Sequence, residues 1–180
     1  LVREIERTGR VALAQFYARR ARRLLPAAAL VLVAAALMTW WLLPITQRRV
    51  FGLDIVSAAF YVVNWRLADR SVDYLAEDVA ASPVQHFWSL AVEEQFYIVW
   101  PLVLVAALAL THRAGRRDDT ADARARGMRA IRIGILLVLI TSLLFSIYYT
   151  AAEPEVAYFV TTTRLWELAI GAALAVFAPQ

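Results

Sequence analysis

LLPAAALVLVAAALMTWWLL, residues 24–43, decides the fold class of this chain. The stretch has no charged residue, and about 20 apolar residues are what an α-helix needs to cross a hydrocarbon core of roughly 30 Å. Trp40 and Trp41 lie at its far end, where tryptophan anchors a helix in the membrane interface. Four arginines precede the stretch, so the positive-inside rule places its start in the cytoplasm: Arg19, Arg20, Arg22 and Arg23.

The composition agrees with an integral membrane protein. Of 180 residues 61% are hydrophobic and 19% are charged, and the mean hydropathy is +0.57. The chain has no cysteine, and His86 and His112 alone could not build a zinc site, so we expect no metal. All 19 cationic residues are arginines. They cluster beside apolar runs, where membrane topology explains them, and we therefore expect no nucleic-acid partner.

Three further apolar runs are predicted spans. They cover Phe96–Leu110, whose helix is expected to begin at Ser82 as N-cap with Pro83 as first helical residue, then Ile133–Tyr149 and Leu165–Phe177. The predicted fold is therefore all-α: a polytopic membrane helical bundle with about four transmembrane helices and one re-entrant or interfacial helix.

Whether the number of membrane crossings is odd or even determines on which side of the membrane each loop lies. This number therefore decides how two remaining segments are interpreted. Residues 112–132 carry seven arginines and no apolar run, which predicts a hydrophilic cytoplasmic loop. Phe51–Trp65 is apolar but contains Asp54, and a full crossing there would place that loop outside. We interpret Phe51–Trp65 as the re-entrant or interfacial helix, with a complete span and an inverted loop as the alternative.

Residues 82–97, SPVQHFWSLAVEEQFY, place polar side chains at the head of an apolar run. On a helix, a spacing of three and four puts His86, Ser89, Glu93 and Tyr97 on one face, with Glu94 about 100° away. An unpaired carboxylate near the apolar half costs several kcal/mol, so the stretch predicts a base, an acid or a ligand for a polar substrate. The alternative is a water-facing half-helix whose glutamates pair with Arg66, Arg70 or Arg164.

Three weaker patterns complete the candidate site. The i, i+3 pairs Arg19/Arg22 and Arg20/Arg23 suit a phosphate-rich ligand, or else form an ordinary positive-inside anchor. Arg164 and Glu167 predict a buried pair that either lines a cavity shared with Glu93 or fixes the depth of the last span. The further candidate cavity residues are Asp54, Asn64, Gln95 and Tyr97.

Four stretches together resemble the acyltransferase 3 family, membrane proteins that O-acetylate lipopolysaccharide, peptidoglycan and other glycans. They are FYARRARRLLP, LDIVSAAFYVVNW, SPVQHFWSLAVEEQFYIVWP and TTTRLWELAIGAALA, in the order of the family and over nearly the whole chain. The resemblance implies transfer of an acyl group from a cytoplasmic acyl-CoA, acetyl-CoA in the usual case, to a glycan hydroxyl across the bilayer. It implies no bound cofactor, and a multi-pass location in the bacterial inner (plasma) membrane.

The resemblance also implies roles for particular residues. Arg20 and Arg23 match the family's RxxR motif and would face the anionic donor. The family's HxWSLxxEEQ stretch is matched by residues that would line the acceptor side: His86, Ser89, Glu93, Glu94 and Gln95. We expect Glu93 to orient or polarise a histidine or the sugar hydroxyl, and Arg164 to stabilise Glu93 or to hold the acceptor.

The chain departs from the family pattern at both ends. The family's first span, with an arginine and a histidine ten residues apart, has no counterpart, and later spans are also missing. We therefore expect residues 1–180 to be a partial acyltransferase 3 membrane domain that is inactive alone. Two other classes stay open: a transporter or flippase for a polar or anionic substrate, and a non-catalytic membrane subunit.

Overall fold

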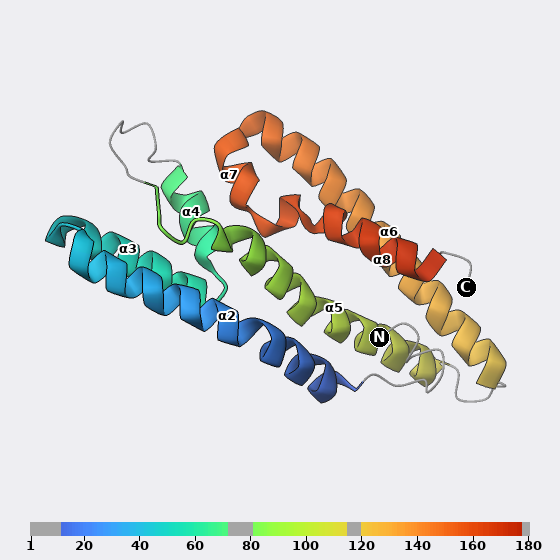
Figure 1. Cartoon of the computed structure of the whole chain (residues 1–180). Coiled ribbons are helices and arrows are strands. Elements are labelled where there is room, and N and C mark those ends of the chain that lie inside the picture. Colours follow the sequence, from blue (N-terminus) through green and yellow to red (C-terminus); the bar gives the residue numbers. More distant parts are fainter. Residues whose placement is uncertain (1–11, 72–80, 115–119, 178–180) are drawn as a thin grey trace. The chain divides into compact units, whose positions relative to one another are not determined.

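The computed structural model describes residues 12–71, 81–114 and 120–177 (Figure 1). Within these ranges the chain forms helices and no strand, so the all-α prediction is confirmed there. The elements are α2 (Leu13–Leu42), α3 (Ile45–Ala59), α4 (Val63–Ser71), α5 (Phe87–Ala114), α6 (Thr120–Ala152), α7 (Pro154–Phe159), the 3-10 turn η2 (Thr161–Thr163) and α8 (Leu165–Phe177).

The chain divides into two compact units, which we describe separately. The first unit comprises Ala14–Gln95 and Ile147–Thr161. The second unit comprises the described parts of Leu1–Leu13, Phe96–Ser146 and Thr162–Gln180.

Two helices are long and apolar enough to cross a membrane. They are Leu13–Leu42 and the part of α6 from Ala125 to Ala152, and α8 is apolar but shorter. Large apolar side chains on α2 point outward, with Leu30 73% and Trp41 78% exposed. Such a surface is expected of a lipid-facing helix. The two long apolar helices contain the spans predicted at residues 133–149 and, except for Leu43, at residues 24–43.

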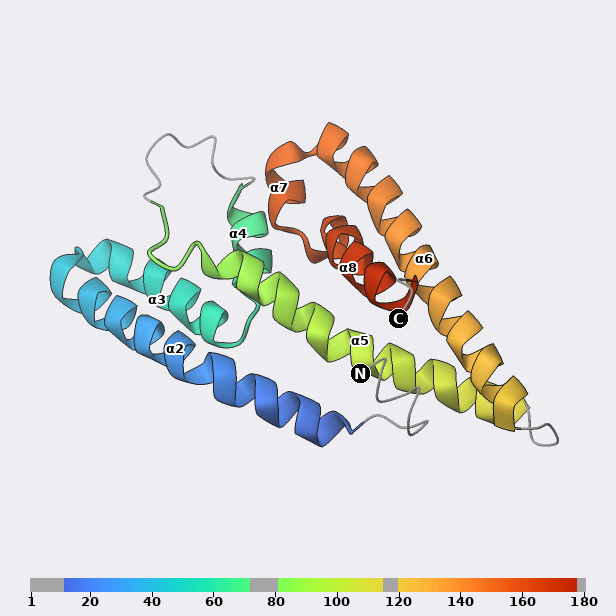
Figure 2. The same ribbon diagram turned by 45° about the vertical axis from the view of Figure 1, so that its right-hand side comes forward.

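Helices α2 and α3 form an antiparallel hairpin within the first unit (Figures 1 and 2). The guanidinium of Arg48 lies 5.3 Å from the ring centre of Trp40 and donates a hydrogen bond to the Leu43 carbonyl, which fixes the corner. Ala58, near the end of α3, packs in the same core as Leu32 of α2. Leu32 is ten residues from the end of α2, about 15 Å at 1.5 Å per residue, so α3 reaches half the depth of a roughly 30 Å core.

The chain reverses directly after α3. The N–H of Tyr61 bonds to the Ala58 carbonyl and the N–H of Val62 to the Ser57 carbonyl, with Tyr61 at φ 54°. This is a Schellman cap, which usually places glycine at the left-handed position. The cap satisfies carbonyls that hydrocarbon could not, and α4 then leads away from the turn. The break agrees with a re-entrant segment, but the single helix predicted over Phe51–Trp65 is wrong, because this cap divides it.

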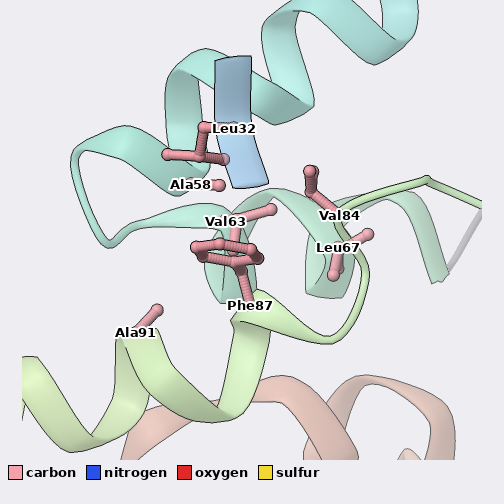
Figure 3. Packing of buried hydrophobic residues seen from close by; sticks show 7 residues of the cluster. All are labelled: Leu32, Ala58, Val63, Leu67, Val84, Phe87 and Ala91. Carbon is pink, nitrogen blue, oxygen red and sulfur yellow. The ribbon is translucent and has the colours of Figure 1, made fainter. Parts of the chain in front are cut away.

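A buried apolar cluster holds the first unit together. Figure 3 shows its members, contributed by α2, α3, α4, α5 and the segment before α5: Leu32, Ala58, Val63, Leu67, Val84, Phe87 and Ala91. Val63, Val84 and Ala91 are fully buried. Because the cluster collects residues from 32 to 91, it fixes α3 and α4 against α2 and the start of α5.

The start of α5 differs from the prediction. The helix begins at Phe87, and the residues from Ser82 onward form successive i→i+3 turns, with Gln85 N–H bonded to Ser82 O and Phe87 N–H to Val84 O. The tighter turns bring both Val84 and Phe87 into the buried cluster, and the Ser82 hydroxyl therefore caps no helix.

The hydrophilic loop predicted at residues 112–132 is also different. Helix α5 continues to Ala114 and α6 begins at Thr120, so residues 120–132 are helical. Alanine and arginine are strong helix formers, and this stretch contains both in quantity and no proline. Residues 115–119 lie outside the described part, and the cytoplasmic location of the segment stays a prediction.

In the second unit α6 packs against α8. Ile131, Ile135 and Val176 form its buried cluster, and the Arg132 guanidinium lies 5.4 Å from the centre of the Phe177 ring. The hydroxyl of Ser142 donates to the Thr162 carbonyl at 2.6 Å and accepts from the Trp166 N–H at 3.0 Å. One hydroxyl thus joins the start of α8, predicted at Leu165–Phe177 and found there, to the middle of α6.

Single cysteines can test the re-entrant path of α3 and α4, because this chain has no cysteine of its own. Thr46 and Asp69 are exposed near the start of α3 and the end of α4, and Arg129 is exposed in α6. In the full-length protein we expect a membrane-impermeant maleimide to label Thr46→Cys and Asp69→Cys in intact cells. Arg129→Cys should react only after permeabilisation, and Asp69→Cys reacting only then would show that the segment crosses completely.

Candidate functional site

An arginine–glutamate pair joins the two predicted motifs. The Arg20 Nε atom donates to both carboxylate oxygens of Glu94, at 2.8 and 3.0 Å, and its Nη2 atom also donates to Oε1. The side chains are 22% and 12% exposed, so the pair is largely withdrawn from solvent. Seventy-four residues separate the partners, and the bidentate fork fixes the orientation of the carboxylate as well as its charge.

The pairing locates Glu94 along α2. Arg20 lies 22 residues before the end of α2 at Leu42, about 33 Å away along the helix. Glu94 therefore lies beside Arg20 on the first half of α2, before the apolar residues 24–43. The partners considered from the sequence are engaged elsewhere, since Arg66 and Arg70 bind Asp54 and Arg164 binds Glu167.

The next residue, Gln95, is the centre of a polar network. Its Nε2 donates to the Tyr61 carbonyl at 2.7 Å and to Asn64 Oδ1 at 2.9 Å. Its Oε1 accepts from Thr161 Oγ1 at 2.6 Å and from Trp65 Nε1 at 3.2 Å. All four hydrogen-bonding positions of the amide are filled, the full capacity of a glutamine side chain.

Asn64 closes the network. Its side chain is fully buried, and its Nδ2 donates to Thr161 Oγ1 at 2.9 Å and to the Phe159 carbonyl at 3.2 Å. The network therefore ties the reversal at Tyr61 to α5 and to the segment after α7. Asn64 and Gln95, predicted as cavity residues, lie together here and serve as structural cross-links.

Asp54 is fully buried and is held by two arginines of α4. Arg66 Nε donates to its Oδ1 at 2.6 Å and Arg70 Nη1 to its Oδ2 at 2.7 Å. One buried carboxylate between two cations leaves a net positive charge on the group. The group locks α3 to α4, because a lone charge at this depth would cost several kcal/mol.

The other three polar residues of the HxWSLxxEEQ stretch are exposed, whereas its Trp88 and Leu90 are half-buried. His86, Ser89 and Glu93 lie on one side of the start of α5, although His86 precedes the helix. The Glu93 carboxylate forms no hydrogen bond or ion pair with the described residues. The stretch therefore presents two sides, a paired side with Glu94 and Gln95 and an exposed side with His86, Ser89 and Glu93. We call the second the free side, because its carboxylate has no partner among the described residues and its Ser89 hydroxyl donates only to the nearby His86 carbonyl, at 3.4 Å.

Three predicted site residues lie in the second unit. Arg164 Nη1 donates to Glu167 Oε1 at 2.7 Å, and the side chains are 28% and 44% exposed. The pair forms as its spacing predicted, but it is not buried, because η2 and the first turn of α8 leave it at the surface. Tyr97 is half-buried with its ring 5.8 Å from that of Phe96.

Three participants in the Gln95 network are missing from the sequence prediction: Tyr61, Trp65 and Thr161. Tyr61 contributes only a carbonyl, which no side-chain pattern reveals. Trp65 follows the predicted Asn64 in the YVVNW stretch, and its indole N–H is the signal that points to a hydrogen-bond partner. Thr161 belongs to a run of three threonines in a connecting segment, where hydroxyls are common and carry little information.

Comparison with known proteins identifies the family. A family model described as an acyltransferase domain matches residues 5–179, and the chain therefore belongs to this acyltransferase family, as the motifs predicted.

Two curated relatives are similar over nearly the whole chain. "Putative peptidoglycan O-acetyltransferase YrhL" of Bacillus subtilis (strain 168) is 35% identical over 168 residues, which cover 92% of this chain and 24% of that protein. "O-acetyltransferase OatA" of Staphylococcus aureus (strain NCTC 8325 / PS 47) is 33% identical over 182 residues, which cover 99% of this chain and 27% of that protein. The chain thus spans about a quarter of the length of these relatives. No solved structure matches it.

Replacing Glu94 by Gln leaves the Arg20 guanidinium without its anion, which should destabilise the first unit by about 2 kcal/mol, since both partners are largely buried. We expect the thermal midpoint of the full-length protein in detergent to fall by several degrees. The matched control is Glu93→Gln on the free side, which should leave the midpoint unchanged. Equal midpoints for the two variants would contradict a stabilising role for the pair.

Replacing Gln95 by Leu leaves the Tyr61 carbonyl, the Asn64 carbonyl oxygen and two donors without partners. Each unpaired group costs about 1–3 kcal/mol, so the folded yield and the thermal midpoint should both drop. Asn64→Leu should act likewise, and the double variant should lose less than the sum because both changes remove one network. Gln47→Leu at the start of α3 is the control. Additive losses would show that Gln95 and Asn64 act separately.

Proposed function

We propose that the protein to which this chain belongs is an O-acetyltransferase of the bacterial inner membrane. It transfers an acetyl group from cytoplasmic acetyl-CoA to a hydroxyl of a cell-envelope glycan on the far side of the multi-pass domain. Family membership and the names of the two relatives support the reaction, and the two long apolar helices support the location. The observation that carries the proposal is the Arg20–Glu94 pair, which unites the two motifs on which the family resemblance rests.

We assign the acyl-transfer step to the free side of the HxWSLxxEEQ stretch. O-acyl transfer needs a base near the acceptor hydroxyl and donors for the tetrahedral oxyanion. Glu93 is a carboxylate with no partner among the described residues, so it is available to accept a proton or to orient a histidine. Glu94 and Gln95 are positioning residues, because their hydrogen-bonding groups are used by Arg20 and by the polar network.

The two arginines of the RxxR motif are assigned different tasks. Arg20 holds Glu94, so its charge is balanced within the protein. Arg23 is exposed on the same helix and forms no ion pair with the described residues. Arg23 is therefore the residue we assign to the phosphates of the acetyl-CoA donor, which an arginine fork binds by charge-assisted hydrogen bonds.

A transporter is the second candidate. The broken helix pair α3–α4, with the buried Asp54 beside it, is a feature of membrane proteins that move polar substrates. Such a protein would carry its substrate across the bilayer and form no ester bond. Detection of the product therefore separates the two candidates.

The test uses the full-length protein in native membranes, with labelled acetyl-CoA and a cell-wall glycan acceptor. Glu93→Gln should lower kcat at least about a hundredfold, the usual contribution of general acid–base catalysis. Arg23→Ala should raise the KM for acetyl-CoA about tenfold with little change in kcat, as expected for one lost charge-assisted contact.

Arg22→Ala is the matched control, because Arg22 is exposed one position before Arg23 and its Nε bonds only to the Ala18 carbonyl among the described residues. Full transfer by Glu93→Gln would eliminate Glu93 as the base. Absence of any acetylated glycan in the wild type, together with movement of the substrate, would favour the transporter.

A further inference from the structure

A cavity of about 430 Å³ lies in the first unit, apart from the residues assigned to acetyl transfer. It is formed by the end of α4, the turns before α5 and the helix α7, which packs against α4. Its volume falls within the range of roughly 300–1,000 Å³ that small-molecule sites occupy. The topology predicted from the sequence places the segment containing α7 on the outer side, where the glycan acceptor resides.

One buried hydroxyl in this cavity has no partner. Ser82 lines the cavity and is 8% exposed, and its Oγ atom forms no hydrogen bond with the described residues. The neighbouring Ser71, by contrast, donates its hydroxyl to the Ala68 carbonyl at 2.7 Å. An unpaired buried hydroxyl is unfavourable, because it has lost its hydrogen bonds to water. A ligand that bonds to Ser82 would remove that cost.

The cavity lining also contains hydrogen-bond donors and acceptors, including one positively and one negatively charged side chain. Arg70 is fixed by its bond to Asp54 and is one of two cations on that carboxylate, which leaves positive charge at this edge. Glu155 contributes an exposed carboxylate and Gln85 an amide that both donates and accepts. A ligand bearing hydroxyl groups, which donate and accept alike, can use all of these.

Aromatic and apolar side chains complete the lining. Tyr158 is 48% exposed, and its ring lies 4.6 Å from that of Trp88 and 5.0 Å from that of Phe159. These neighbours hold the Tyr158 ring in place as a flat apolar surface. Leu67 and Pro154 add further apolar area.

We infer that this cavity binds a sugar unit of the acceptor glycan, an inference that rests on the proposed function. A sugar ring has apolar C–H faces for the aromatic surface and hydroxyl edges for Ser82, Arg70 and Gln85. A simple anion could use Arg70 but would also meet the Glu155 carboxylate, and a hydrocarbon chain would leave the Ser82 hydroxyl unpaired. The mixed lining thus selects a polyhydroxylated ligand.

The inference is tested by binding of a soluble tetrasaccharide of N-acetylglucosamine to the full-length protein in nanodiscs, measured by calorimetry without acetyl-CoA. Ser82→Ala should weaken binding roughly two- to tenfold, the equivalent of one hydrogen bond. Tyr158→Leu should weaken it about tenfold. Because the Ser82 hydroxyl has no partner among the described residues, the thermal midpoint of Ser82→Ala should equal or exceed that of the wild type.

Two controls match these changes outside the cavity. Thr150→Ala removes an exposed hydroxyl, and Tyr148→Leu removes a ring that is 71% exposed. Both should bind the tetrasaccharide like the wild type. Failure of the wild type to bind, or equal affinities for all variants, would overturn the inference.

The transfer assay separates this inference from the proposed function. If acetyl transfer occurs, Ser82→Ala and Tyr158→Leu should raise the KM for the glycan and leave the KM for acetyl-CoA unchanged. If no acetyl transfer occurs but the two variants still lose affinity for the tetrasaccharide, the proposed function fails and the sugar site stands.

Discussion

The amide side chain of Gln95 is the constraint on which the first unit depends. In the predicted re-entrant topology, the turn after α3 lies inside the bilayer, where water cannot solvate its peptide groups. The Schellman cap satisfies part of that turn internally, and Gln95 binds the remaining Tyr61 carbonyl from a different helix. Its other three bonds reach Asn64, Trp65 and Thr161, so a single side chain joins α4, α5 and the segment after α7.

The buried carboxylates of the first unit also have hydrogen-bond partners from other helices, and these partners are arginine side chains. Two carboxylates of the first unit, Asp54 and Glu94, are each held by a guanidinium at hydrogen-bond distance. Arginine suits this task because its planar fork binds two oxygens at once and its charge cannot be lost by deprotonation. Arginines, whose clusters beside apolar runs are explained by membrane topology, therefore also hold the buried carboxylates of this unit.

The features that depend on composition, such as the positions of apolar helices, could be predicted from the sequence. The features that depend on the conformation of one turn or on one long-range contact could not. The apolar runs located α2 and α8, and the polar head of α5 identified the stretch with Glu93 to Gln95. The break between α3 and α4 was hidden, because its left-handed residue is a tyrosine and the turn contains no glycine or proline. The pairing of Arg20 with Glu94 was missed because i, i+3 and i, i+4 rules reach only neighbouring turns, and these residues are 74 apart.

The buried group of Asp54, Arg66 and Arg70 has a consequence for how the protein enters the membrane. Helix α3 carries the acid, and its two counter-charges are synthesised 12 and 16 residues later on α4. Until α4 has left the ribosome, α3 holds an unbalanced charge that lipid would reject. We therefore expect α3 and α4 to enter the bilayer together, with residues 45–71 as one insertion unit.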